Sequence, residues 1–420
     1  MLNYQRFIIY SFASISLFIG LIFGENSSGG AKIDFEFFQP YLESFTNDFV
    51  LGLNSYLNNA GSIIHSPVFY ILVSLLNKIT NEIYLIRIFY IILCCFFPYL
   101  FYLILKDKFK INRNILFLFS LIIFLSPYFR SSAIWLGGDN LSLIFFGLSI
   151  YFFNKIYELK KNNFVNYFLC LFFLILCCYI RYYYCIFSLY YLFFFFKRMS
   201  LKSFFLLIAI SLLLSFPAIF YFIYIFINLN FLNTVTNYSQ INFYSNSLTI
   251  LSILSFYLLP LCYLQLNLFK KYLIKNKKLI STFFTLIFCM YFLNLFFFEN
   301  LINFSPRGGG VFMKISELIK VQSSLFLSLI SFFSLIMIDY LFKEKRLQNY
   351  SLLIILILSF PIYTIFQKYF DPLFFIFFFG LIQSNSLKII LLDYKKFLTI
   401  NYGFFTFFYL FALFYYKTGI

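Results

Sequence analysis

Long apolar runs alternate with short polar breaks along the whole chain. A run such as residues 204–226 lacks the period-two alternation of apolar and polar side chains that a membrane β-strand needs. It has the length of a bilayer-spanning helix, about 20 residues, and a helix satisfies its backbone hydrogen bonds internally. The runs therefore predict transmembrane helices at residues 7–23, 83–105, 114–127, 141–154, 164–180, 183–196, 203–227, 248–269, 279–298, 321–342, 351–366, 373–387 and 397–416.

This pattern predicts an all-α fold, a polytopic transmembrane bundle of about 13 helices in one integral-membrane domain, residues 1–420. The count ranges from about 11 to 13, because runs such as 114–127 and 183–196 are short for a span. Segment 67–77 is too short to cross, so we expect it to lie at the external surface or re-enter it. No internal repeat supports a two-fold transporter architecture.

Composition agrees with a membrane protein: 62% of residues are hydrophobic, 11% are charged, and the mean hydropathy is +0.89. The 70 Phe and 36 Tyr residues are read as genome bias rather than as platforms for stacking bases or sugars. The eight cysteines all lie in apolar runs without a CxxC motif or a Cys/His cluster, so we expect neither disulfides nor a metal site.

The polar breaks fall into two classes that alternate along the chain. Six basic breaks hold 21 of the 32 Lys and Arg residues and only four acids: 106–113, 155–161, 197–202, 270–278, 343–346 and 388–396. The other breaks hold eight bases and ten acids: 24–82, 128–140, the break at 181, 228–246, 299–320 and 367–372. The positive-inside rule places the first class in the cytoplasm and the second outside, with a cytoplasmic N-terminus.

The net charge of +17 therefore reflects topology and not a nucleic-acid partner. Run 7–23 lacks a small-residue cleavage site and predicts an uncleaved signal anchor. Short hydrophilic ends favour a bacterial inner membrane over the ER membrane. Any chemistry is expected at the external face, in a catalytic loop over residues 24–82 and a second loop over residues 299–320.

Loop 24–82 concentrates acids in a basic chain, with five of the fifteen acids between residues 24 and 67. Apolar positions from Phe37 to Phe45 follow a helical period and predict an interfacial helix. Pro40 disfavours helix before about residue 39, so we expect Asp34 and Glu36 on an extended segment with both carboxylates pointing one way. These carboxylates are the candidate catalytic groups. The alternative is that they are solvated loop acids, or that Asp34 caps a helix.

The external loops also supply candidate substrate-binding groups. His65 is the only histidine, and it serves either the chemistry or the start of a helix at Pro67. Arg181 suits a phosphate but equally suits a headgroup anchor in an aromatic belt. The same two readings apply to Arg130 with Asp139. Further external charges lie at Arg307, before three glycines, and at Lys368.

Several short motifs resemble the membrane-embedded class C (GT-C) glycosyltransferases, which include protein mannosyltransferases, lipid A aminoarabinose transferases and dolichyl-phosphate-glucose glucosyltransferases. Family members often carry Asp-Glu early in the first loop and His-Pro-Pro-Leu-Tyr-Tyr later. The matching segments here are Asp34-Phe35-Glu36, His65-Ser66-Pro67-Val68-Phe69-Tyr70, Asp139-Asn140-Leu141, Arg181-Tyr182 and Tyr369-Phe370-Asp371-Pro372.

The resemblance implies sugar transfer at the external face from a polyprenyl- or dolichyl-phosphate donor to a lipid or glycan acceptor. The donor's tail would lie between helices and its phosphate among external bases. Asp34 would be the general base that deprotonates the acceptor hydroxyl, with inversion at the sugar carbon. Such enzymes usually need no metal, and no cofactor is implied.

Two other functions fit a polytopic chain with external charges. A transporter or flippase of lipid-linked saccharides needs charges or broken helices near the bilayer midplane. Here most spans carry no charge, and Arg87 and Asp339 lie towards span ends, which disfavours transport. A polysaccharide polymerase or ligase usually has a large external loop late in the chain, whereas loop 299–320 is only moderate in length.

Overall fold

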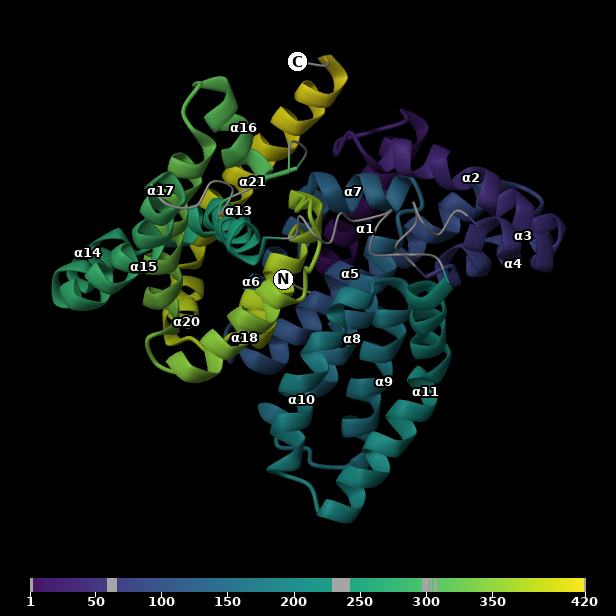
Figure 1. Ribbon diagram of the computed structural model, residues 1–420, viewed down its shortest axis with the longest axis horizontal. Coiled ribbons are helices and arrows are strands. Elements are labelled where there is room, and N and C mark those ends of the chain that lie inside the picture. The colour runs from purple at the N-terminus through teal and green to yellow at the C-terminus, as the bar shows by residue number, and fades with distance from the viewer. Residues whose placement is uncertain are drawn as a thin grey trace. The chain divides into compact units, whose positions relative to one another are not determined.

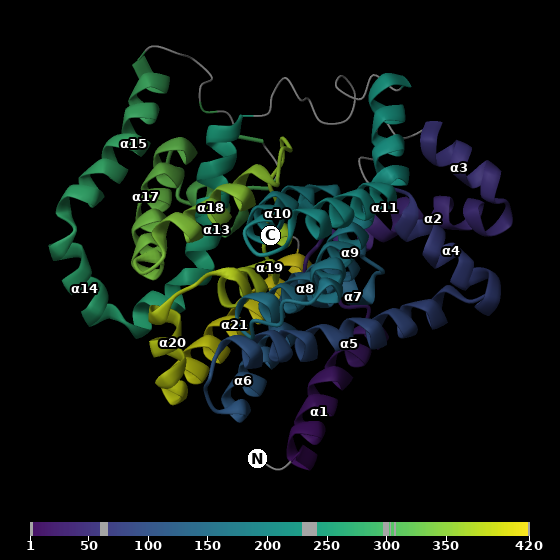
Figure 2. The same cartoon turned by 90° about the horizontal axis from the view of Figure 1, so that it is seen from below.

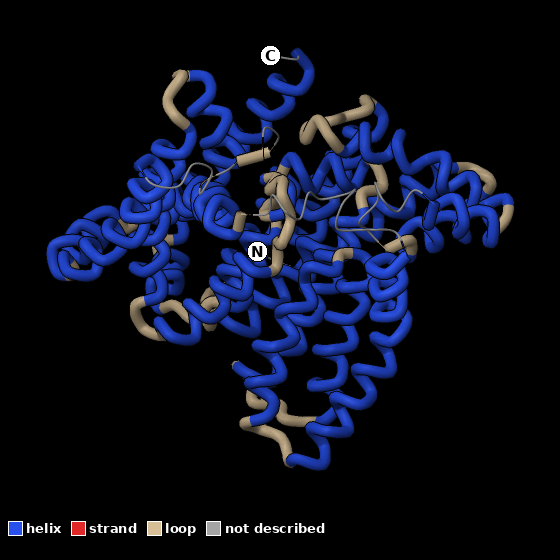
Figure 3. The backbone as a smooth tube through the Cα atoms, viewed as in Figure 1, coloured by secondary structure: helices blue, strands red, loops and turns tan. Residues whose placement is uncertain are grey.

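The computed structural model describes residues 3–58, 66–228, 242–296, 302, 304–305 and 308–418, and every regular element among them is a helix (Figure 3). The all-α fold class is therefore confirmed. The chain contacts divide into two compact units. The first comprises Met1–Val235 and Tyr402–Ile420, and the second comprises Thr236–Asn401.

The first unit is built around α8, which packs against both α5 and α9, while α11 packs on α9 and α2 packs on α3 and α4 (Figures 1 and 2). Its helices are α1 (Asn3–Ile22), α2 (Ala31–Asn47), α3 (Phe49–Asn58), α4 (Val68–Thr80), α5 (Ile83–Lys108), α6 (Arg113–Ser120), η1 (Leu121–Leu125), α7 (Pro127–Ile134), α8 (Gly138–Tyr157), α9 (Phe164–Ile180), η2 (Tyr182–Ile186), α10 (Phe187–Phe196) and α11 (Leu201–Asn228).

In the second unit α17 packs against both α13 and α15. The helices here are α13 (Phe243–Leu264), α14 (Leu266–Lys275), α15 (Lys277–Phe296), α16 (Gly310–Leu318), α17 (Ser323–Phe342), α18 (Arg346–Leu358), η4 (Gln367–Tyr369), α19 (Leu373–Phe375), the π-helix η5 (Ile376–Leu381) and α20 (Asn385–Leu392). The last helix, α21 (Tyr394–Thr418), begins in the second unit and ends in the first.

Seven described helices are long and apolar enough to cross a membrane. They are Tyr4–Ile22, Ile83–Lys108, Leu201–Tyr224, Phe243–Leu264, Lys277–Phe296, Ser323–Phe342 and Tyr394–Lys417. Two bent pairs raise the number to nine if each pair is one span. Other predicted spans fall on shorter apolar helices such as Phe164–Ile180 and Arg346–Leu358, so an integral multi-pass protein is supported and the count of 13 stays a prediction.

Two helix pairs are bent at short breaks. Arg113–Leu125, which covers most of predicted span 114–127, meets Pro127–Ile134, which lies mostly in the predicted break 128–140, at 66°. Leu373–Leu381 and Asn385–Leu392 meet at 108° within and just beyond predicted span 373–387. At the first break, Ser126 precedes Pro127 and accepts a hydrogen bond from the Phe129 backbone N–H, so it caps a new helix. The short segment predicted at 67–77 forms α4, with Pro67 at its N-cap.

The extended segment expected at residues 34–36 is wrong. Helix α2 begins at Ala31 and contains Pro40 in its interior. A proline removes one backbone donor from a helix, and here α2 continues because it packs on α3 and α4. The predicted helical period over Phe37–Phe45 is confirmed, but Asp34 and Glu36 lie on that same helix. They are about 200° apart around its axis and do not point one way.

Candidate active site

Asp34 occupies the first turn of α2, where its backbone N–H donates to the Gly30 carbonyl at 2.8 Å. A carboxylate in a first turn faces the positive end of the helix dipole, which favours this position. Helical spacing puts Asp34 on the same face as Phe38, Leu42 and Phe45. Leu42 and Phe45 are buried, whereas Asp34 is exposed. Asp34 therefore lies on the same face of α2 as the buried Leu42 and Phe45, at the exposed end of that face.

Tyr70 on α4 connects α2 to the rest of the site. Its ring stacks on Phe38 of α2, with ring centroids 4.3 Å apart. The charged groups around its buried hydroxyl are the Arg181 guanidinium and the Asp34 and Asp139 carboxylates. Burial raises the pKa of Tyr70 far above its usual value, Arg181 lowers it, and the two carboxylates raise it. Three of the predicted site residues thus act electrostatically on one hydroxyl.

The buried Arg181 and the half-buried Asp139 form an ion pair between the ends of two helices. Asp139 lies in the first turn of α8, and Arg181 is the C-cap residue of α9, so each charge suits its helix terminus. Arg181 Nε lies 2.5 Å from Asp139 Oδ1, and the Tyr183 hydroxyl lies 3.4 Å from the same oxygen. Burial by itself lowers the pKa of Arg181, but Asp139 reverses this and the pKa is raised well above its usual range. The guanidinium is permanently charged.

Tyr90 of α5 fixes the start of α8 beside this pair. Its hydroxyl donates to the Gly137 carbonyl at 2.5 Å and accepts from the Leu141 backbone N–H at 3.2 Å. Asn140 Nδ2 donates to the Phe129 carbonyl at 2.8 Å, which joins α8 to α7. These hydrogen bonds from α5 and to α7 fix the start of α8, and with it the position of Asp139, whose carboxylate is contacted by Arg181 and Tyr183.

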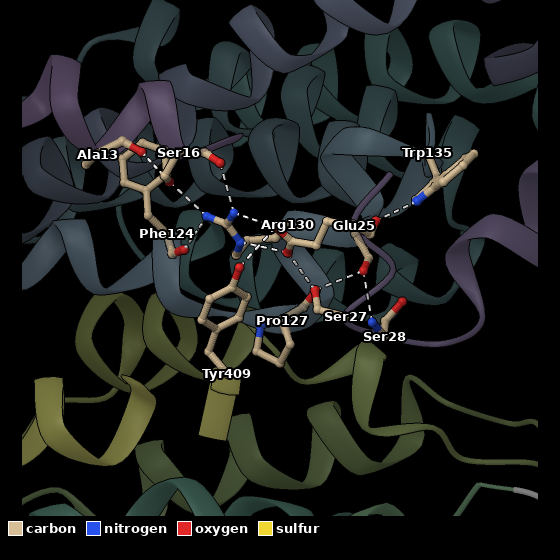
Figure 4. Close-up of polar contacts among 11 residues, drawn as sticks. Ala13, Ser16, Glu25, Ser27, Ser28, Phe124, Pro127, Arg130, Trp135 and Tyr409 are labelled. Atoms are coloured by element: carbon tan, nitrogen blue, oxygen red, sulfur yellow. Dashed lines mark hydrogen bonds and ion pairs between the residues drawn. The ribbon is translucent and has the colours of Figure 1, made fainter. Parts of the chain in front are cut away.

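A second buried ion pair joins the segment that follows α1 to α7 (Figure 4). Arg130 Nη2 and Nε donate to the two oxygens of Glu25 at 2.6 and 2.8 Å. Its remaining hydrogen bonds go to the Ser16 hydroxyl and carbonyl and to the Phe124 carbonyl. Every nitrogen of this guanidinium has an acceptor within the protein, so a phosphate would have to displace one.

Neighbouring groups also bind Glu25 and complete the surroundings of this ion pair. The Tyr409 hydroxyl of α21 donates to Glu25 Oε2 at 3.0 Å, and Trp135 Nε1 donates to the Glu25 carbonyl at 2.7 Å (Figure 4). Gly20 of α1 leaves the space that the pair needs, because a Cβ there would stand 2.6 Å from Glu25 Oε2. Arg130 thus anchors the segment that leads into α2 and Asp34.

An apolar cavity of about 500 Å³ lies in the first unit between α9, α10 and α11. Its walls include Leu174 and Ile175 of α9, Leu192 of α10 and Ile219 of α11. Tyr182, which also lines it, directly follows Arg181. The cavity therefore has an apolar body with a buried cation next to one of its wall residues.

The remaining predicted residues lie elsewhere or outside the described part of the chain. Glu36 is exposed and pairs with Lys32 at 3.7 Å. His65 and Arg307 lie outside the described residues. Lys368 belongs to the second unit, with its ammonium 5.5 Å from the Phe366 ring. Among the described residues, no three His, Cys, Asp and Glu side chains come close enough together to hold a metal ion.

Three residues of this region received no role from the sequence. Tyr70 is the last residue of the segment that resembles the family motif, so that motif could have identified it as a candidate site residue. Glu25 is paired with a residue 105 positions away, which no local pattern indicates. Arg87, a charge inside an apolar run, is the kind of residue that functional sites in membranes use. Comparison of the chain with protein-family models, curated proteins and solved structures finds no match.

Proposed function

We propose that this protein is a glycosyltransferase that moves a sugar from a polyprenyl-phosphate donor to an acceptor hydroxyl. The observation that carries the proposal is the ion pair of the buried Arg181 with the half-buried Asp139, together with the exposed Asp34 as a further charge that acts on the nearby Tyr70 hydroxyl. An accessible carboxylate and a fixed cation are the two charges that such a transfer requires. The external face of a bacterial inner membrane is the proposed location.

In the proposed reaction Asp34 accepts the proton of the acceptor hydroxyl. The acceptor oxygen forms a bond to the anomeric carbon on the face opposite the phosphate, and the bond from that carbon to the phosphate oxygen breaks. The electron pair of the broken bond leaves with the polyprenyl phosphate, and the configuration at the sugar carbon inverts. Asp34 is the catalytic residue, and its exposure suits a hydroxyl that arrives from outside.

Arg181 is the proposed partner of the leaving phosphate. Asp139 engages Nε at 2.5 Å, and this helps to fix the plane of the guanidinium. A buried, preorganised cation stabilises developing charge more strongly than an exposed one. The apolar cavity between α9, α10 and α11 is the proposed site for the prenyl tail, since Tyr182 in its wall adjoins Arg181.

Profiles of lipid-linked sugars in cells with and without this protein test the proposal. We expect the polyprenyl-phosphate sugar to accumulate in cells without the protein, and one class of glycan or lipid to lose that sugar. An experiment with the purified protein in vesicles could give the opposing result. Movement of a lipid-linked saccharide across the vesicle membrane with no transfer product would identify a transporter and overturn the proposal.

A further inference from the structure

Arg87 is half-buried near the start of α5, in surroundings unlike those of Arg130 and Arg181. Its Nε donates to the Ile134 carbonyl at 2.8 Å. The guanidinium carbon stands 4.3 Å from the centre of the Trp135 ring and 5.6 Å from that of Phe35. Its Nη2 atom is buried and has no hydrogen-bond partner in the described part of the chain. Buried charged donors are normally satisfied, so this nitrogen is suited to an acceptor from a ligand.

The charge balance around Arg87 also differs. Arg130 and Arg181 each meet a buried or half-buried carboxylate, whereas no ion pair of Arg87 is found among the described residues. A second cation adds to the excess, because the Lys32 ammonium lies 5.6 Å from the same Trp135 ring. Lys32 is neutralised in part by Glu36 at 3.7 Å. The ring therefore has two cations near it and one exposed carboxylate.

The first turn of α2 places this site apart from the Arg181 site. Asp34 is a charged neighbour of Tyr70, together with Arg181, while the adjacent Phe35 contacts Arg87. Successive residues of a helix are about 100° apart around its axis, so the Asp34 and Phe35 side chains leave α2 in different directions. The apolar cavity shares no wall residue with the surroundings of Arg87. One site adjoins the cavity and the other does not.

We infer that Arg87, with Lys32, binds a phosphate group carried by the acceptor, on the other side of Asp34 from the donor phosphate. A guanidinium is planar and donates to two phosphate oxygens, and stacking on Trp135 fixes its orientation. This inference rests on the proposed function, because the donor phosphate is assigned there to Arg181. It specifies the acceptor as a phosphorylated lipid or glycan.

Trp135 is the only tryptophan of the chain, so its fluorescence reports directly on this site. The full-length protein in phosphatidylcholine nanodiscs is titrated with inorganic phosphate at constant ionic strength, with chloride as the reference salt. We expect a saturable change in fluorescence that Arg87→Gln weakens about tenfold or more. Arg113→Gln, an exposed arginine in a different part of the unit, is the matched control and should behave as the wild type.

Binding of undecaprenyl phosphate, measured in the same nanodiscs, separates the two sites. Arg87→Gln should keep that binding and Arg181→Gln should lose it, and neither measurement needs sugar transfer. Loss of both ligands in Arg87→Gln, or an unchanged phosphate response, would refute the second site. So would a wild-type response that disappears in phosphatidylglycerol nanodiscs, since bilayer headgroups would then occupy Arg87. Arg87→Lys keeps the charge and serves if the glutamine variant fails to fold.

Discussion

At the residue scale, the roles of Asp34 and Glu36 follow from helix geometry. Asp34 is one of the charges that act on Tyr70, whereas Glu36 leaves α2 about 200° away around the helix axis and pairs with Lys32. The sequence predicts the importance of Asp34 but not this separation. A rule about proline describes local preference, and the packing of α2 on its neighbours overrides it at Pro40.

Ion pairs show the same limit of sequence reasoning. Arg130 and Arg181 are equally plausible phosphate ligands from sequence, because their carboxylate partners lie 105 and 42 positions away in the chain. The structure gives Arg130 a complete set of acceptors, including both oxygens of Glu25. Its role as a phosphate ligand stays a prediction, and the contacts favour a structural role.

Replacement of Glu25 by Gln tests that structural role. The pair is almost fully buried, with side-chain exposures of 5% and 6%. Removal of one charge therefore leaves the other buried without its partner. We expect the free energy of unfolding to fall by about 3 kcal/mol. Thermal unfolding in detergent measures the change.

Glu36→Gln is the matched control for this experiment. It breaks an exposed ion pair whose side chains are 48% and 57% accessible, and such pairs contribute little to stability. Equal unfolding temperatures for Glu25→Gln and the wild type would contradict a structural role for the buried pair.

At the element scale, apolar periodicity predicts where helices lie but not where they bend or what they enclose. The long helices α1, α5, α11, α13, α15, α17 and α21 all coincide with predicted runs. The bends of 66° and 108° and the cavity between α9, α10 and α11 depend on contacts between helices. Such contacts are absent from a hydropathy profile.

Filling the cavity tests its proposed use for a prenyl tail. Ser215 of α11 lines the cavity, and Ser215→Phe places a bulky ring inside it. We expect undecaprenyl phosphate to bind at least about tenfold more weakly, because the tail loses its space. Binding to the purified protein in nanodiscs provides the measurement.

Leu213 lies on the same helix and is 75% exposed, so Leu213→Phe places the same ring outside the cavity. The two variants differ in where the ring is added. If both bind undecaprenyl phosphate like the wild type, the tail does not use this cavity.

At the scale of the whole molecule, charge placement predicts topology more firmly than apolar length predicts the number of spans. Seven, nine and 13 spans are all odd, so each places the two termini on opposite faces. The choice among them depends on short helices such as α9 and α10. Basic residues between α8 and α9 predict that these helices cross.

Cysteine labelling in a background without native cysteines tests this topology. Asn47→Cys in the first loop should react with a membrane-impermeant reagent in intact cells. Lys160→Cys and Lys275→Cys should react only after the cells are opened, because their loops are predicted to be cytoplasmic. All three residues are exposed. External labelling at Lys160 would contradict a crossing by α8 and α9.

The most direct test of the central claim asks whether the Asp34→Asn variant can restore sugar transfer when it is expressed in cells that lack the protein. The measured quantity is the polyprenyl-phosphate sugar that accumulates in those cells, at equal membrane levels of each variant. Asn cannot accept the proton, so transfer should fall by about 10²–10⁴-fold, while Glu36→Gln on the opposite side of α2 should restore it. Full restoration by Asp34→Asn would contradict the account.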